Sequence, residues 1–376
     1  MKIGAIDPQL LAENITKRIT EDVQAQRICG ASVAVLQRGK LIFKQTFGAQ
    51  CPGKEEPLRE NAIFRIASMT KPITAVAVLL QAQRGKLSLM DPVAKYLPAY
   101  GGITVGEEGR PSGTPMLIWH LLTHTGGFEA DLESKLWVKA IPPECQRTLD
   151  EGVHYYLKRP LCFEPGTQRK YSGRAGFDVL ARIVEITAGV DYGTFLQREI
   201  FAPCGMVDTT FSPSEKQWER VVGMHDYQDG CGVLSETTPG CVVDRVPVTH
   251  TLGGSGLVST LDDYILFAEM LQNGGMAAGG RILEPCWVTQ MATPQLDVSL
   301  MNEKVNQGLG VRVVAGEKYP WLPVGSFGWS GVYGTHFWID PVNGITAIYM
   351  KNSRFDGGSG AVTGKHFEED VFSSIL

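Results

Sequence analysis

The 376-residue sequence lacks long apolar runs, and no stretch approaches the length that a membrane-spanning helix needs. The first residues lack the apolar segment and cleavage site of a secretory signal. Positive charge is not in excess, since 35 Lys and Arg stand against 40 Asp and Glu, for a net charge of -5. This balance argues against non-specific nucleic-acid binding. We therefore expect a cytoplasmic protein with neither nucleic acid nor membrane as a partner.

Cysteine is sparse and scattered. The eight cysteines form neither a Cys-x-x-Cys pair nor a cluster with metal-ligand spacing. We expect free thiols that are mostly packed as small core residues. The sequence also lacks His-Glu-x-x-His, Gly-x-Ser-x-Gly, the Walker A motif and Gly-x-Gly-x-x-Gly. These absences argue against zinc peptidases, the α/β-hydrolase elbow and the common nucleotide enzymes, so we expect no metal and no cofactor.

What the sequence does contain is ordinary globular material, 43% hydrophobic and 20% charged, which is enough for a large core. Period-two strand patterns occur near both ends, and helical patterns fill the middle. Strands are predicted at 31–36, 41–47, 308–314, 325–329, 334–339 and 345–351. Helices are predicted at 8–26, 68–85, 116–125, 150–157, 171–187, 192–200, 260–272, 283–291 and 364–374.

This order predicts an α/β (α+β) fold with one antiparallel sheet built from both termini, flanked by helices, plus an inserted mainly helical lobe. We expect a single catalytic domain over 1–376, with an α/β lobe at about 1–66 and 300–376 and a helical lobe at about 67–299. Residues 209–251 are poor in periodic signal. A loop this long is typical of an active-site wall or lid, although a plain surface excursion explains it as well.

The sequence pattern that most strongly indicates a nucleophile with a base is the Ser-x-x-Lys formed by Ser68 and Lys71. The following run is apolar nearly all round, which predicts a buried central helix that begins close to Ser68 and ends at Gly85. Residues three apart share a helix face, so Lys71 lies one turn above the hydroxyl. Burial and a positive helix N-terminus favour a neutral lysine that can accept the serine proton. A helix-capping serine explains the pattern equally well.

Tyr171 is the second candidate. It follows a Pro-Gly turn at a predicted helix start, from which it could carry a proton between Ser68 and a leaving group. A capping aromatic packed on the core is the alternative. His124 invites a Ser-His-Asp hypothesis, which is weaker because a helix end explains a histidine through the helix dipole.

A tetrahedral intermediate also needs donors for its oxyanion. The backbone N–H of Ser68 sits at a predicted helix N-terminus and can supply one of them. The small residues at 330–332 suggest an edge strand where a substrate can approach the backbone, although Gly331 can equally mark a bulge or bend.

Three motifs occur in the order found in the serine β-lactamase and penicillin-binding-protein superfamily. Ser68-Met69-Thr70-Lys71, Tyr171-Ser172-Gly173 and Trp329-Ser330-Gly331 resemble its Ser-x-x-Lys, Tyr-x-Asn and Lys-Thr-Gly. Residues 64–68, 121–127, 254–260 and 334–341 also resemble its class C branch, so that the resemblance spans about 31–352.

The resemblance implies a site between a sheet lobe and a helical lobe. It implies that Ser68 is the acylated nucleophile and that Lys71 and Tyr171 share the role of general base. It further implies an oxyanion hole formed by the N–H groups of Ser68 and Val332. The substrate-binding residues that it implies are Trp329, Gly331 and Gly173.

Two departures from the family pattern concern the substrate. Gly173 stands where lactamases have Asn, and Trp329 stands where they have Lys. Such variants resemble the family VIII carboxylesterases. We therefore predict a serine carboxylesterase that acts on a small-molecule ester through an acyl-enzyme. The alternatives are a β-lactamase, a D-amino-acid peptidase or amidase, an acyltransferase of the same fold, and a non-catalytic binding domain. The natural ester and the oligomeric state are left open.

Overall fold

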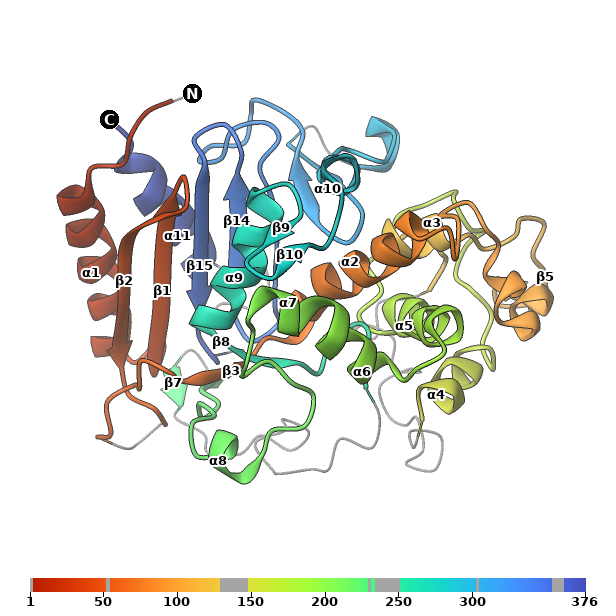
Figure 1. Ribbon diagram of the computed structural model, residues 1–376, viewed down its shortest axis with the longest axis horizontal. Coiled ribbons are helices and arrows are strands. Elements are labelled where there is room, and N and C mark those ends of the chain that lie inside the picture. The colour runs from red at the N-terminus through yellow and green to blue at the C-terminus, as the bar shows by residue number, and fades with distance from the viewer. Residues whose placement is uncertain are drawn as a thin grey trace.

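The computed structural model describes residues 3–51, 55–128, 148–228, 231–233, 251–301, 304–353 and 362–376. Its largest element is a seven-stranded antiparallel sheet in the order β11-β12-β13-β14-β15-β1-β2 (Figure 1). The strands are β1 Gly30–Gln37, β2 Lys40–Gly48, β11 Val305–Gln307, β12 Arg312–Val314, β13 Phe327–Ser330, β14 His336–Asp340 and β15 Ile345–Met350. Because β1 pairs with β15, the predicted sheet built from both termini is confirmed.

Helices cover both faces of this sheet (Figure 1). On β1, Val33 and Val35 belong to a cluster with α1 (Pro8–Gln24) and α11 (Val362–Ser373). The alternate residues Ala34 and Leu36 belong to the other core, which includes α9 (Leu261–Gln272). This alternation is what a strand buried on both faces requires. The β1–β2 hairpin turns at Arg38 and Gly39, with φ of 52° and 75°, the left-handed pair of a type I′ turn.

The helix that carries the predicted nucleophile lies in the middle of the molecule (Figure 1). A 3₁₀ turn, Ala67–Met69, leads into α2, Thr70–Gln83, and the α2 residues from Thr70 to Gln81 are buried. The prediction of a buried central helix is therefore confirmed. The other helices are α3 Ile118–Leu122, α4 Leu149–Tyr156, α5 Ala175–Ala188, α6 Tyr192–Leu196, α7 Ala202–Cys204, α8 Glu215–Trp218 and α10 Pro285–Met291. The other short strands are β3 Ile63–Arg65, β4 Thr104–Val105, β5 Arg110–Pro111, β6 Asp226–Gln228, β7 Cys231–Val233, β8 Val258–Thr260, β9 Met276–Ala277 and β10 Gly280–Arg281.

The prediction that a helix begins at Tyr171 is wrong. The helix α5 begins at Ala175, and Tyr171 lies in irregular backbone before it. The Ser172 hydroxyl accepts the N–H of Gly176 at 3.1 Å, so a side chain near the turn satisfies a donor of the first helical turn. Because Tyr171 itself lies outside the helix, helical hydrogen bonds do not fix its position, and contacts with other segments have to do so.

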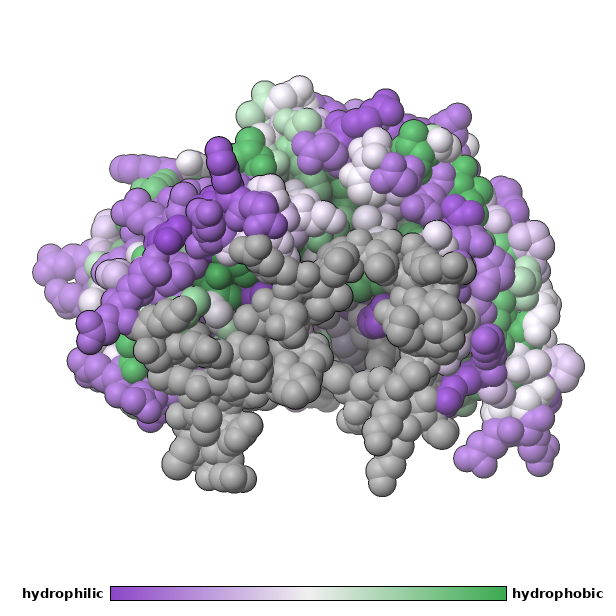
Figure 2. Space-filling view, turned by 90° about the horizontal axis from the view of Figure 1, so that it is seen from below, coloured by the Kyte–Doolittle hydropathy of each residue, from purple (hydrophilic) through white to green (hydrophobic). Residues whose placement is uncertain are grey.

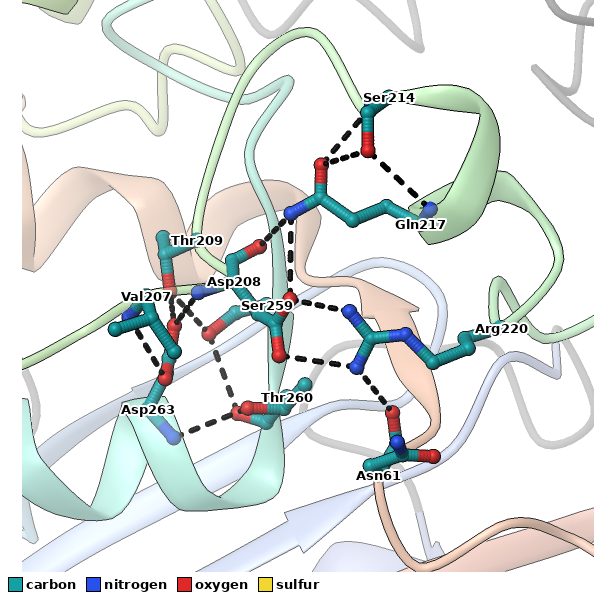
Figure 3. A network of polar contacts seen from close by, with 10 residues as sticks. All are labelled: Asn61, Val207, Asp208, Thr209, Ser214, Gln217, Arg220, Ser259, Thr260 and Asp263. Atoms are coloured by element: carbon teal, nitrogen blue, oxygen red, sulfur yellow. Dashed lines mark hydrogen bonds and ion pairs between the residues drawn. The ribbon is translucent and has the colours of Figure 1, made fainter.

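A polar network holds the beginning of the 209–251 segment, as far as Arg220, in place (Figure 3). The carboxylate of Asp263 on α9 accepts the N–H of Asp208 at 2.8 Å and the hydroxyl of Thr209 at 2.8 Å. Asp208 forms an ion pair with Arg220. These contacts hold the segment against β8, which pairs with β3 directly before the Ser68 turn. Residues 229–230 and 234–250 lie outside the described residues, so the wall or lid stays a prediction.

In the described part of the chain, no helix has the length and apolar character that crossing a membrane requires. Hydrophilic residues make up much of the described surface in Figure 2, with hydrophobic residues in smaller groups between them. Among the cysteines whose side chains are described, Cys204 is buried, Cys29 and Cys51 are half-buried, and Cys162 and Cys286 are exposed. The prediction that most cysteines are packed as small core residues is therefore wrong for this part of the chain.

Candidate active site

Ser68 lies in a strained turn at the entry to α2. The preceding residue, Ala67, has a φ of 45°, a left-handed conformation that is costly for a residue with a Cβ. The hydroxyl of Thr335 donates to the carbonyl oxygen of Ile66 at 3.2 Å and helps to hold this turn. The first N–H groups of a helix have no acceptor within the helix, so the Ser68 N–H is left to donate to another oxygen, which the oxyanion hypothesis requires.

Lys71 and Tyr171 both contact the Ser68 hydroxyl. Ser68 Oγ lies 2.7 Å from Tyr171 Oη and 3.2 Å from Lys71 Nζ. Lys71 is fully buried, and its Nζ also donates to the carbonyl oxygens of Gly173 at 2.6 Å and Gly254 at 2.8 Å. The structure thus brings together three segments that are far apart in the sequence.

The three partners of Lys71 suit both of its protonation states. A neutral amine has two N–H bonds and one lone pair, so it can donate to both carbonyls and still accept the proton of the Ser68 hydroxyl. An ammonium has three N–H bonds and can donate to all three oxygens. Lys71 can therefore take up and return a proton without losing either carbonyl contact.

The Gly254 carbonyl is held by a support that the sequence analysis did not include. The buried Asp178 accepts the Gly254 N–H at 3.1 Å and the Tyr156 hydroxyl at 2.6 Å. A Cβ on Gly254 would lie 2.9 Å from the Gly173 carbonyl oxygen, so glycine lets the two loops close on Lys71. Residues 254–260 entered the sequence analysis only as a stretch that resembles the family, and the adjacent Gly253 and Gly254 were the available signal for a close approach of the backbone.

Trp329 and Ser330 are neighbours on β13 and point to opposite faces of the sheet. The Trp329 ring lies 6.0 Å from the Tyr171 ring and is half-buried. Ser330 Oγ hydrogen-bonds to His336 Nδ1 at 2.8 Å, and Nε2 of His336 lies 3.0 Å from Glu368 Oε1. The third motif therefore presents Trp329 to the site, while its serine anchors the strand from behind.

Gly331 and Val332 follow at the end of β13. A Cβ on Gly331 would collide with the Ile66 carbonyl oxygen and with Thr335 Oγ1, so glycine allows this turn to pack against the Ser68 segment. Within the described residues, the Val332 N–H has no hydrogen-bond acceptor. It is thus available to a substrate oxygen, as the oxyanion hypothesis requires.

The beta-lactamase family model matches residues 15–366. The chain belongs to the beta-lactamase family. Esterase EstB of Burkholderia gladioli is 26% identical over 96% of this chain and 95% of that protein. Monacolin J acid methylbutanoyltransferase of Aspergillus terreus is 27% identical over 88% of this chain and 81% of that protein.

Solved structures show the same fold. EstCE1, described as a hydrolase with promiscuous acyltransferase activity, has a TM-score of 0.81 at 22% identity and covers 97% of this chain and 99% of its own. Simvastatin synthase (LovD) from Aspergillus terreus has a TM-score of 0.80 at 21% identity, with 98% of both chains covered. The predicted superfamily and fold are confirmed, and this beta-lactamase family member is a serine hydrolase by fold and family, with esterase and acyltransferase relatives.

His124 in this family member is not the dipole-stabilised cation that the sequence suggested. It follows α3 with a φ of 58° and is buried. Burial, together with the nearby cations Arg169 and Lys71, lowers the pKa of His124 well below its usual value, so the ring is neutral. Its Nδ1 accepts the Ser172 N–H at 3.3 Å, which does not fit a Ser-His-Asp relay to Ser68.

Proposed function

We propose that this protein hydrolyses carboxylic esters through an acyl-enzyme formed on Ser68. The observation that carries the proposal is the position of Ser68 Oγ, within hydrogen-bond distance of both Tyr171 Oη and Lys71 Nζ. A serine needs a neighbour that removes its proton, and here two such neighbours contact one hydroxyl. The esterase relative, aligned over nearly the whole chain, supports the same activity.

The reaction follows from these contacts. Ser68 Oγ attacks the ester carbonyl carbon while its proton passes to Lys71 or Tyr171, and the N–H groups of Ser68 and Val332 stabilise the oxyanion. When the intermediate collapses, the bond to the alcohol oxygen breaks and the alcohol leaves with that proton. Water then attacks the acyl-enzyme by the same proton path in reverse, which releases the acid and restores Ser68.

The residues around the nucleophile favour an ester over a β-lactam. Trp329 replaces the cation that would pair with a lactam carboxylate, and Gly173 replaces the amide side chain of the family motif. A charge-assisted contact contributes about 1.5–3 kcal/mol, so a lactam loses more from these changes than an uncharged ester does. The indole offers a flat apolar wall that suits an acyl chain or an aromatic ester.

Acyl transfer is the second candidate, because one relative is named as a methylbutanoyltransferase. In that reaction an acceptor alcohol replaces water in the second step, with the same residues moving the proton. Adding a primary alcohol during ester turnover separates the two reactions. A transferase forms the new ester at the expense of the free acid, whereas a strict hydrolase releases acid at an unchanged yield.

Substrate class is tested with p-nitrophenyl esters from acetate to laurate beside nitrocefin and a penicillin. We expect good turnover of short-chain aryl esters, weak or no turnover of the penicillin, and at most slow turnover of the activated cephalosporin. Trp329→Lys should raise the affinity for carboxylate-bearing lactams and impair apolar esters, since it restores a cation at the substrate edge. Penicillin hydrolysis faster than ester hydrolysis by the unmodified protein would overturn the proposal in favour of a lactamase.

The close packing at Gly331 gives a second test. Gly331→Ala should lower kcat on p-nitrophenyl acetate about 10- to 100-fold, because the added Cβ pushes the turn that carries the Val332 N–H away from Ser68. Gly102→Ala is the matched control, since a Cβ there meets no atom within 4 Å and should leave kcat unchanged. A Gly331→Ala variant with full kcat would show that the 331–335 turn is not part of the site.

A further inference from the structure

His124 accepts hydrogen bonds from the residues directly before and after Tyr171. The Lys170 N–H donates to the His124 carbonyl oxygen at 3.0 Å, and the Ser172 N–H donates to His124 Nδ1 at 3.3 Å. Tyr171 itself lies in neither a helix nor a strand, so regular backbone hydrogen bonds do not fix it. The residues on both sides of Tyr171 are thus hydrogen-bonded to His124, which lies 47 positions before Tyr171 in the sequence.

The imidazole ring lies among the aromatic groups of the site. Its centroid is 4.8 Å from that of Tyr171 and 5.3 Å from that of Phe177. It stacks on Trp329 at 5.7 Å, with an angle of 16° between the ring planes. One buried ring therefore contacts the proposed proton carrier and the proposed substrate wall at the same time.

The backbone at His124 is itself held in a costly conformation. Its φ of 58° lies in the left-handed region, which among residues with a Cβ favours Asn, Asp and His. On either side, the hydroxyls of Thr123 and Thr125 lie 2.9 Å apart, and Thr123 Oγ1 also donates to the Trp119 carbonyl oxygen at 2.8 Å. Strain that the surroundings hold in place is typical of residues with a functional task.

The ring is suited to hold its neighbours rather than to move protons. Because Nδ1 accepts the Ser172 N–H, a neutral ring carries its proton on Nε2. Nε2 is buried and has no hydrogen-bond partner among the described residues. A proton on Nδ1 would face the hydrogen of the Ser172 N–H, and the charges of Arg169 and Lys71 disfavour a further positive charge on the ring.

We propose that His124 is a positioning residue for the proposed ester hydrolysis, with its carbonyl oxygen and Nδ1 fixing Tyr171 and its ring fixing Trp329. The two functions are separable. Losing the Nδ1 acceptor displaces the group that moves the proton and lowers kcat. Losing the ring loosens the substrate wall and raises KM for aryl esters.

Two variants separate these effects. His124→Asn keeps tolerance of the left-handed backbone and offers Oδ1 as an acceptor in place of Nδ1, but removes the ring. His124→Gly also tolerates the backbone and removes both. We expect kcat to fall about 10- to 100-fold in His124→Gly and to stay within about threefold of wild type in His124→Asn. KM for p-nitrophenyl butyrate should rise in both variants.

The matched controls are His154→Asn and His154→Gly on α4, where the histidine side chain is 48% exposed. There the imidazole hydrogen-bonds the Asp150 carbonyl oxygen within its own helix, so the two control variants measure what the same substitutions do at an exposed position. Their kcat and KM should stay at wild-type values. Equal kcat in the two His124 variants, or wild-type KM in both, would overturn the proposed role. Thermal unfolding curves show which variants are folded at the assay temperature.

A spectroscopic measurement on the full wild-type chain covers the case in which the variants do not fold. Long-range ¹H–¹⁵N NMR of the ¹⁵N-histidine-labelled protein should show His124 neutral, with its proton on Nε2, between about pH 6 and 8. A proton on Nδ1, or a charged ring, would contradict the acceptor role. If the wild type cleaves no ester, the proposed function fails, while the NMR result still decides whether His124 can hold Ser172.

Discussion

Ser68→Ala is expected to abolish ester hydrolysis while the protein stays folded. Loss of a nucleophile removes several orders of magnitude in rate, on the order of 10⁴- to 10⁶-fold in kcat. Ser68 is not a helix N-cap in the structure, because α2 is preceded by Met69 without any side-chain cap, and so the stability cost of the substitution should be small. The measurement is the initial rate on p-nitrophenyl acetate beside the thermal unfolding midpoint.

Ser88→Ala is the matched control for that variant. Ser88 is exposed, and its hydroxyl accepts the Met90 N–H at 3.2 Å, so the substitution removes a local backbone contact without touching the site. The substitution should lower the free energy of unfolding by no more than about 2 kcal/mol and leave kcat unchanged. A folded Ser68→Ala protein with near-normal turnover would mean that another residue is the nucleophile.

Lys71→Ala and Tyr171→Phe should each lower kcat much more than they raise KM. Both side chains contact the hydroxyl that loses its proton, and general acid–base catalysis contributes about 10²- to 10⁴-fold. Tyr171→Phe removes one oxygen and keeps the ring contacts, which makes it the cleaner of the two.

The control for the tyrosine is Tyr96→Phe, which removes a hydroxyl that donates to Asp91 at 2.6 Å in a different part of the chain. It should leave kcat at the wild-type value. Lys71→Ala leaves two carbonyl oxygens without their buried donor, so its unfolding midpoint has to be measured before its rate is compared. Folded variants that both keep kcat near the wild-type value would contradict the Ser68, Lys71 and Tyr171 assignment.

The sheet and the central helix were predictable because their signals are local. The alternation on β1, the turn at Arg38 and Gly39, and the apolar run after Ser68 each depend on neighbouring residues. The short strands β8 and β11 were missed because three residues carry too little periodicity to identify. The predicted helix at 116–125 was longer than α3, and the predicted helix at 171–187 began before α5. Turns and side-chain contacts set these helix ends, and a periodic pattern does not show them.

Much of the site depends on contacts that no local pattern encodes. Ser68 and Tyr171 are 103 positions apart, and Lys71 and Gly254 are 183 positions apart. The resemblance in motif order predicted that Ser68, Lys71, Tyr171 and Trp329 share a site. The structure places Lys71 and Tyr171 against the Ser68 hydroxyl and the Trp329 ring beside the Tyr171 ring. The supports from Asp178 and His124 were not predicted, because a buried carboxylate or imidazole shows its partner only in three dimensions.

The central claim, that Ser68 is the acylated nucleophile, is tested most directly by covalent labelling. The full chain is treated with a fluorophosphonate, digested and analysed by mass spectrometry, with ester turnover measured in parallel. We predict one adduct, on the peptide that contains Ser68, with loss of ester hydrolysis in proportion to labelling. An adduct on another residue with loss of activity would contradict the assignment, and a labelled Ser68 in a protein that turns over no ester would favour a binding domain.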